Sequence, residues 1–212
     1  MSSEEATGPG AAARFLAQAA YLEAAAVDAF ETLARELEMH GAPQGLRAAA
    51  RRAARDERRH ARATKKLAER AGARVPAVKV EPPGVRSLEE MAIENAVEGC
   101  VRETFGAAVA MIQAEQAGDL DVRRAMKRIA LDETRHAELS WAVAQWIEPQ
   151  LDADARGRVC KARTRAVDAL AREAAQEPEA SLIGRLGIPK ASQAVAVLDE
   201  LRATLWSGQV AA

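Results

Sequence analysis

Two copies of a Glu-x-x-His segment stand out in a chain of 212 residues that holds only three histidines. The first copy pairs Glu57 with His60, and the second pairs Glu133 with His136. Both lie in alanine-rich stretches that favour helix, where side chains three positions apart share one face. A carboxylate and an imidazole placed in this way can bind one side of a metal ion. A single such pair on a charged helix, however, is more often a solvated ion pair.

Two further glutamates interrupt otherwise apolar helical stripes. Glu23 and Glu98 each lie on such a stripe, which for Glu23 includes Val27 and Phe30. A carboxylate on a core-facing stripe is costly to bury unless it is paired or binds a metal. Four glutamates and two histidines could satisfy one another by holding two divalent cations, so the sequence predicts a dinuclear metal site. The predicted ligands are Glu23, Glu57, His60, Glu98, Glu133 and His136.

The two halves of this region repeat each other. Residues 21–30 align with residues 96–105, and each Glu-x-x-His motif has its counterpart in the other half. A stripe glutamate precedes the motif glutamate by 34 residues in the first half and by 35 in the second. This near-symmetry selects Glu98 as the counterpart of Glu23.

Neighbouring acids leave two alternatives on the third helical stretch. Glu94 lies one turn before Glu98 and could be an extra ligand, although its counterpart in the first half is Ala19. Glu103 comes five residues after Glu98, which is about 140° round an α-helix. We therefore expect Glu103 to face elsewhere.

Arginine-rich helix faces support two competing interpretations. The acids could belong to a buried salt-bridge network with Arg59, Arg102 and Arg135 instead of a metal site. A basic stripe within residues 51–66 could also face nucleic acid or phosphate. No aromatic residues interleave this stripe for base stacking, and the net charge of the chain is −1. We interpret it as a solvated face and expect no nucleic-acid partner.

Turn residues divide the chain into helices. Gly41 and Gly72 are typical of helix ends, and three prolines with a glycine within residues 74–86 exclude a helix there. Ser87 followed by Glu90 predicts a capping box at a helix start. After a tail at 1–10, which we expect to be disordered, the expected helices cover 11–40, 43–71, 87–118, 119–146 and 150–175, with a last one that ends near 206.

The lengths of the connections predict the topology. Short joins pair the first helix with the second and the third with the fourth, so each pair forms an antiparallel hairpin. The long link between the pairs can span the length of a helix. With 49% hydrophobic but only 3% aromatic residues, the composition also favours helix. We predict an all-α four-helix bundle at 11–148 and a helical extension at 149–212.

Composition excludes several classes of protein. No stretch approaches the roughly 18 apolar residues of a membrane helix, and the polar N-terminus is unlike a secretory signal. Cys100 and Cys160 are too few for a disulfide framework or a four-cysteine metal site. We therefore expect a cytoplasmic protein without a membrane partner.

Two glutamates and two Glu-x-x-His motifs in related hairpins resemble the di-iron carboxylate proteins of the ferritin-like superfamily, such as bacterioferritin and rubrerythrin. The resemblance covers about residues 11–147. It implies that Glu57 and Glu133 bridge two metals, and that the other four predicted ligands complete them in pairs. It also implies that Asp56 and Asp132 accept the free ring N–H of ligating histidines from the opposite hairpin. The implied cofactor is two iron ions, with manganese or zinc as alternatives.

Departures from these relatives bear on function. Phe30 and Phe105 stand where relatives often carry a tyrosine, and two cysteines cannot form a four-cysteine electron relay. The C-terminal extension at 149–212 disfavours assembly into a large storage cage. The resemblance implies an oxidoreductase that activates oxygen or peroxide, as an oxidase, a peroxidase or a small-molecule oxygenase. An iron-storage or ferroxidase protein and a scaffold with structural metals are the alternatives. The electron donor and oligomeric state are not indicated.

Overall fold

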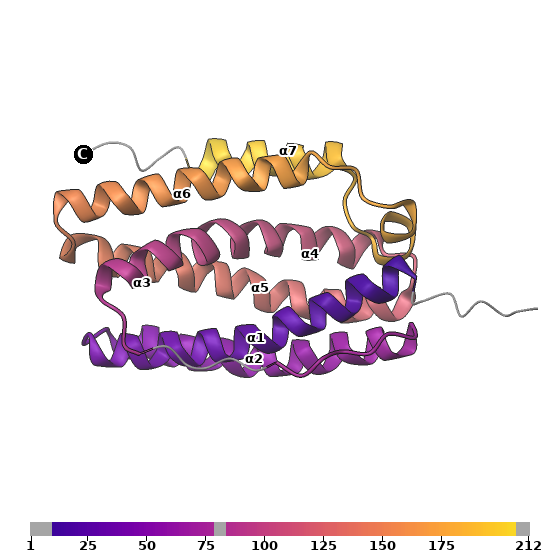
Figure 1. The fold of residues 1–212 in the computed structure, drawn as a ribbon, viewed down its shortest axis with the longest axis horizontal. Coiled ribbons are helices and arrows are strands. Elements are labelled where there is room, and N and C mark those ends of the chain that lie inside the picture. Colours follow the sequence, from indigo (N-terminus) through magenta and orange to yellow (C-terminus); the bar gives the residue numbers. More distant parts are fainter. Residues whose placement is uncertain (1–9, 79–83, 207–212) are drawn as a thin grey trace, which may run out of the picture.

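A computed structural model describes residues 10–78 and 84–206, and within these ranges the chain forms helices and connecting turns without any strand. Two antiparallel hairpins make up the bundle (Figure 1). The first consists of α1 (Ala11–Met39) and α2 (Gln44–Arg70). The second pairs α5 (Leu120–Ile147) with a rod made of α3 (Leu88–Glu94), the π-helical segment η1 (Asn95–Glu103) and α4 (Thr104–Gln116). This confirms the predicted all-α bundle.

Glycines end both helices of the first hairpin. Gly41 has φ +73° and Gly72 has φ +88°, a left-handed conformation that glycine adopts without a Cβ penalty. After α1, the Ala42 amide donates to the Leu37 carbonyl at 2.8 Å, and Gly41 donates to Glu38 at 3.2 Å. The same pair of bonds follows α2, so both helices end in a Schellman motif.

Side-chain caps start the second hairpin. The Glu90 amide donates to the Ser87 hydroxyl at 3.2 Å, and the Ser87 amide donates to the Glu90 carboxylate at 2.8 Å, which forms the predicted capping box. Asp119 accepts from the amides of Asp121 and Val122 at the start of α5.

The crossover joins opposite ends of the bundle. α2 ends at one end and α3 begins at the other, so the two hairpins lie side by side (Figure 1). Residues 79–83 of the crossover lie outside the described residues, as do residues 1–9 of the predicted disordered tail and residues 207–212.

The C-terminal segments cover the outer side of the rod. α6 (Ala153–Ala174) follows a 3-10 turn (Glu148–Gln150), and α7 (Ala191–Leu201) lies between π-helical turns at Leu182–Leu186 and Arg202–Trp206. Figure 1 shows α6 and α7 running along α3 and α4. The Trp206 indole N–H donates to the Cys100 carbonyl of η1 at 2.9 Å. None of the described helices is both long and apolar enough to cross a membrane.

Two apolar clusters fill the bundle on either side of its middle. One contains Phe30, Leu37 and Val143, and the other contains Leu16 and Leu67. Small alanines occupy much of both cores, which lets the helices approach closely. The middle of each bundle helix lies between these clusters, where polar residues replace the apolar ones.

The π-helical segment packs closely against α5 at Gly99. A Cβ atom at position 99 would lie 2.7 Å from Ser140 Cβ and 2.5 Å from Ser140 Oγ. The Asn95 side chain also donates to the Ser140 carbonyl at 2.9 Å. This contact fixes the position of η1 against α5.

The contact at Gly99 predicts that Gly99→Ala destabilises the protein. Because Ser140 Cβ cannot move without its helix, we expect a loss of about 1–3 kcal/mol in the free energy of unfolding. Denaturant unfolding followed by circular dichroism measures this loss. Gly106→Ala is the matched control, because a Cβ there meets nothing within 4 Å. Helix propensity should make that variant more stable by about 0.5–1 kcal/mol. Equal effects at the two positions would contradict the packing argument.

Candidate metal centre

Two groups of potential metal ligands meet in the middle of the bundle. Within each group, the ligand atoms lie within 4.8 Å of one another. Both groups contain Glu133, so they form one continuous cluster, whose residues come from α1, α2, η1 and α5. The first group is Glu23, Glu57, His60 and Glu133, and the second is Glu103, Glu133 and His136.

Each histidine faces carboxylates of both hairpins through its Nδ1 atom. His60 Nδ1 lies 3.1 Å from Glu133 Oε1, 3.4 Å from Glu23 Oε2 and 3.6 Å from Glu57 Oε1. His136 Nδ1 lies 3.0 Å from Glu57 Oε1 and 3.6 Å from Glu133 Oε2. Glu57 and Glu133 thus contact both imidazoles and occupy the centre of the cluster.

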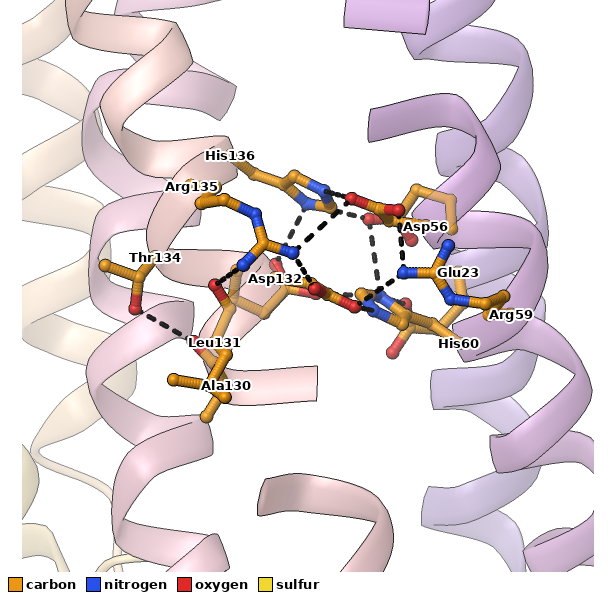
Figure 2. A network of polar contacts seen from close by, with 12 residues as sticks. Glu23, Asp56, Arg59, His60, Ala130, Leu131, Asp132, Thr134, Arg135 and His136 are labelled. Atoms are coloured by element: carbon orange, nitrogen blue, oxygen red, sulfur yellow. Dashed lines mark hydrogen bonds and ion pairs between the residues drawn. The ribbon is translucent and has the colours of Figure 1, made fainter. Parts of the chain in front are cut away.

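Aspartates and arginines surround the histidines on their outer side (Figure 2). Asp132 Oδ2 accepts a hydrogen bond from His60 Nε2 at 3.0 Å, across the two hairpins. Asp56 Oδ2 lies farther from His136 Nε2, at 3.7 Å. Arg59 contacts Asp56 at 2.7 Å and Asp132 at 3.1 Å, and Arg135 also pairs with Asp132. Both aspartates therefore face a ring from the opposite hairpin, and Asp132 is hydrogen-bonded to it, which is compatible with the orienting role that the resemblance implies.

The donor set suits divalent cations. Buried imidazole nitrogens usually have hydrogen-bond partners, yet His60 Nδ1 and both ring nitrogens of His136 have none. Among the described residues, no lysine or arginine pairs with Glu23, Glu57, Glu103 or Glu133. The three arginines of the alternative salt-bridge network bind other acids. Carboxylate oxygens with imidazole nitrogens are ligands that iron, manganese and zinc accept.

The pKa values show how this cluster is tolerated without a cation. Burial raises the pKa of Glu23 to about 8 and holds that of Glu103 well above its usual range. Burial would also raise the pKa of Glu133, but close contacts with His136 and His60 lower it to about 2. Burial opposes protonation of His136, yet its contacts with Glu133 and Glu57 raise its pKa to about 10.

The charges of the metal-free cluster consequently balance near pH 7. The pKa of His60 is also raised and that of Glu57 lowered, so two imidazolium groups face two carboxylates while Glu23 and Glu103 keep their protons. Two divalent cations would balance four carboxylates and two neutral imidazoles. Binding must therefore displace protons.

The acids of the third helical stretch do not all lie where the sequence predicts. Glu98 does not reach the cluster: its side chain is 62% exposed and lies 3.9 Å from Arg102. Glu94 is half exposed and pairs with Arg86. Glu103, which we expected to face elsewhere, belongs to the cluster instead. The cluster contains four glutamates and two histidines, and its carboxylate from this stretch is that of Glu103 instead of Glu98.

A register shift of one residue explains the difference. Both Glu-x-x-His motifs are separated by 76 residues, whereas the alignment of Glu23 with Glu98 uses an offset of 75. An offset of 76 matches Glu23 to Gly99 and Val27 to Glu103. Val27 lies one turn after Glu23 on the same stripe, so Glu103 faces the core.

The π-helix accommodates this extra residue. Its i→i+5 hydrogen bonds place more residues in each turn, so an angle calculated for an α-helix does not apply between Glu98 and Glu103. The two phenylalanines are not equivalent, because Phe30 contacts His136 with ring centroids 4.9 Å apart and ring planes tilted by 54°, while Phe105 packs against the C-terminal helices. The spacing from the stripe glutamate to the motif glutamate is 34 residues in the first half and 35 in the second. This difference was the sequence signal of the extra residue in the π-helix.

We expect Glu103→Gln to remove one carboxylate from one metal and to lower the bound metal to near one ion per chain. Glu98→Gln is the matched control on the same segment and should leave two ions bound. Metal counting by mass spectrometry after anaerobic Fe(II) loading measures both. Retention of two ions by Glu103→Gln together with loss by Glu98→Gln would restore the original assignment.

Asp132→Ala should weaken metal binding about 10–100-fold, because the His60 ring loses the acceptor that orients it. The helical circular dichroism signal should persist. Competition with a chromophoric chelator measures the affinity, and Asp121→Ala serves as a control on the same helix, remote from the cluster. An unchanged affinity would remove Asp132 from the metal centre.

Comparisons with known proteins agree with this geometry. The family model named Rubrerythrin matches residues 14–144, which include all the residues of the cluster. No curated protein and no solved structure matches the chain significantly. Because the matched region spans more than half of the sequence, the chain belongs to the rubrerythrin family of ferritin-like di-iron proteins.

Proposed function

We propose that this protein is a cytoplasmic di-iron oxidoreductase that reduces peroxide, with oxygen as the alternative oxidant. The observation that carries the proposal is the continuous buried cluster in which Glu133 is shared between two groups of ligand atoms. Two bound irons would supply one electron each, and two electrons with two protons convert hydrogen peroxide to two molecules of water. The proposed ligands are Glu23, Glu57, His60, Glu103, Glu133 and His136.

The space beside the cluster favours a small oxidant. A pocket of about 80 Å³ is lined by Glu103, Phe30, Gly99 and Ser140. A water molecule occupies about 30 Å³ in the liquid, so this pocket has room for peroxide or oxygen. An organic substrate of ordinary size needs a larger cavity. The pocket beside Glu103 therefore suits a small oxidant, whereas a wider one of about 250 Å³ lies beside His136 and Asp56.

The surrounding side chains hold the donors and limit water. Asp132 accepts from His60 Nε2 and so leaves Nδ1 directed at the carboxylates. Phe30 covers one side of the His136 ring. His60 and His136 are each almost fully buried, which strengthens their electrostatic interactions with the cluster.

Peroxide consumption by the iron-loaded protein tests the proposal. With two Fe(II) per chain under anaerobic conditions, we expect one peroxide to oxidise both irons, and a chemical reductant to restore them for further cycles. Glu133→Gln should lose this reaction because its carboxylate serves both groups, whereas Glu138→Gln on the exposed side of α5 should retain it. Storage would be indicated instead if iron accumulated far beyond two ions per chain in a cage-sized assembly. A tightly held zinc with no peroxide reaction would indicate a structural metal.

Removing metal should leave the fold but lower its stability. The apolar clusters and the balanced charges of the metal-free site predict that chelator-treated protein keeps its helical circular dichroism signal. Metal bound to the native state only should raise the melting temperature in proportion to its concentration over its dissociation constant. Thermal melts with and without Fe(II) or Zn(II) measure the difference. Loss of helical signal on chelation would show that the core depends on metal.

A further inference from the structure

A second cavity lies between α6 and the second hairpin, away from the metal cluster. It has a volume of about 360 Å³, within the range of small-molecule sites. None of its lining residues belongs to the cluster. Its walls are small or apolar side chains from both sides, including Ala92, Ala96, Cys100, Ala144, Ile147 and Val159.

Gly157 contributes to the open space of this cavity. It lies within α6 and lines the cavity, yet a Cβ atom added there would meet nothing within 4 Å. Glycine within a helix costs about 0.5–1 kcal/mol relative to alanine. Ala96 and Ala144 on the opposite wall are equally short, so α6 packs beside the hairpin with open space between them.

Both basic groups of this cavity lie on α6, and its one acid lies directly after α5. Arg156 and Arg163 line it together with a single acid, Glu148. Arg156 donates to the Leu151 carbonyl at 2.7 Å, and no carboxylate in the described parts of the chain pairs with it. The cavity therefore combines an apolar body with the guanidinium of Arg156, which no carboxylate of the described residues pairs with.

The Cys100 side of the cavity offers no charge to a ligand. Cys100 is 1% exposed, and burial raises the pKa of its thiol to about 12, so the thiol stays neutral. Arginine recognises carboxylates through paired, charge-assisted hydrogen bonds. An apolar group is favoured against Cys100 and the alanines, and an anionic group is favoured beside Arg156.

We propose that this cavity binds a small monocarboxylate with an apolar body, its hydrocarbon against Ala96 and Cys100 and its carboxylate beside Arg156. The site is independent of the metal centre in composition. A ligand there would contact η1 at Ala96 and Cys100, neither of which belongs to the cluster. The proposal does not rest on the function proposed for that cluster.

Calorimetric titration of the full chain with decanoate, below its micellar concentration, tests the proposal. We expect one saturable site, with decanoate binding more tightly than decanol and decylamine binding least. Arg156→Gln should weaken decanoate binding roughly tenfold, as expected for loss of a charge-assisted hydrogen bond, and should leave decanol unaffected. Equal binding of decanoate and decylamine would overturn the charge assignment.

Filling the cavity provides the sharper control. Gly157→Leu introduces a strong helix former whose side chain occupies the hollow, so the variant should fold and lose saturable binding. Gly106→Leu adds the same side chain at an exposed position of α4 and should bind as the native chain does. Unchanged binding in Gly157→Leu would show surface adsorption and overturn the proposal.

Thiol chemistry gives a second readout that does not depend on calorimetry. Cys160 is partly exposed and lines the cavity, so bound decanoate should slow its alkylation. The protection should persist in Gly106→Leu. If Arg156→Gln or the native chain showed no protection at saturating decanoate, the ligand would lie elsewhere and the site would be wrong.

Discussion

The burial of four carboxylates and two imidazoles between apolar clusters is the constraint on which the rest of this structure depends. Ionised carboxylates are costly in such surroundings, and no lysine or arginine of the described residues offsets them there. The raised pKa values of Glu23, Glu103 and His136 favour protons on these groups, which would balance the charges of the cluster without a cation. Two bound divalent cations would replace that balance by neutralising four carboxylates.

The outer layer of the centre follows from the same constraint. Asp132 binds the His60 ring, and Arg59 in turn binds both Asp132 and Asp56. Each motif thus contributes a glutamate and a histidine to the cluster, and the aspartate before it faces the other hairpin. Because these contacts cross between α2 and α5, they also hold the two hairpins together at mid-height, where few apolar residues are present.

The C-terminal helices bear on the centre through η1. Trp206 binds the Cys100 carbonyl, while Asn95 and Gly99 contact Ser140 on the other side. The π-helical segment is therefore held between α5 and the helices that follow the matched family region. These contacts fix the position of η1, from which Glu103 reaches the cluster. The same segment forms part of the wall of the cavity beside α6.

Local sequence rules predicted the helix ends, the topology and the motif residues of this protein. Helix ends at Gly41 and Gly72, the Ser87 cap and the two-hairpin topology were predictable, because each depends on backbone chemistry within a few residues. The motif residues Glu57, His60, Glu133 and His136 were also found, because residues three apart in a regular helix must share a face.

Tertiary structure alone decided which acid joins the cluster from the third helical stretch. The expected ligand Glu98 lies exposed, and Glu103 takes its place because the π-helix shifts the register where Gly99 meets Ser140. That close approach joins residues about 40 positions apart in sequence, so local periodicity could not reveal it. The cavity beside α6 is likewise a product of packing, because short side chains produce a hollow only when helices bring them face to face.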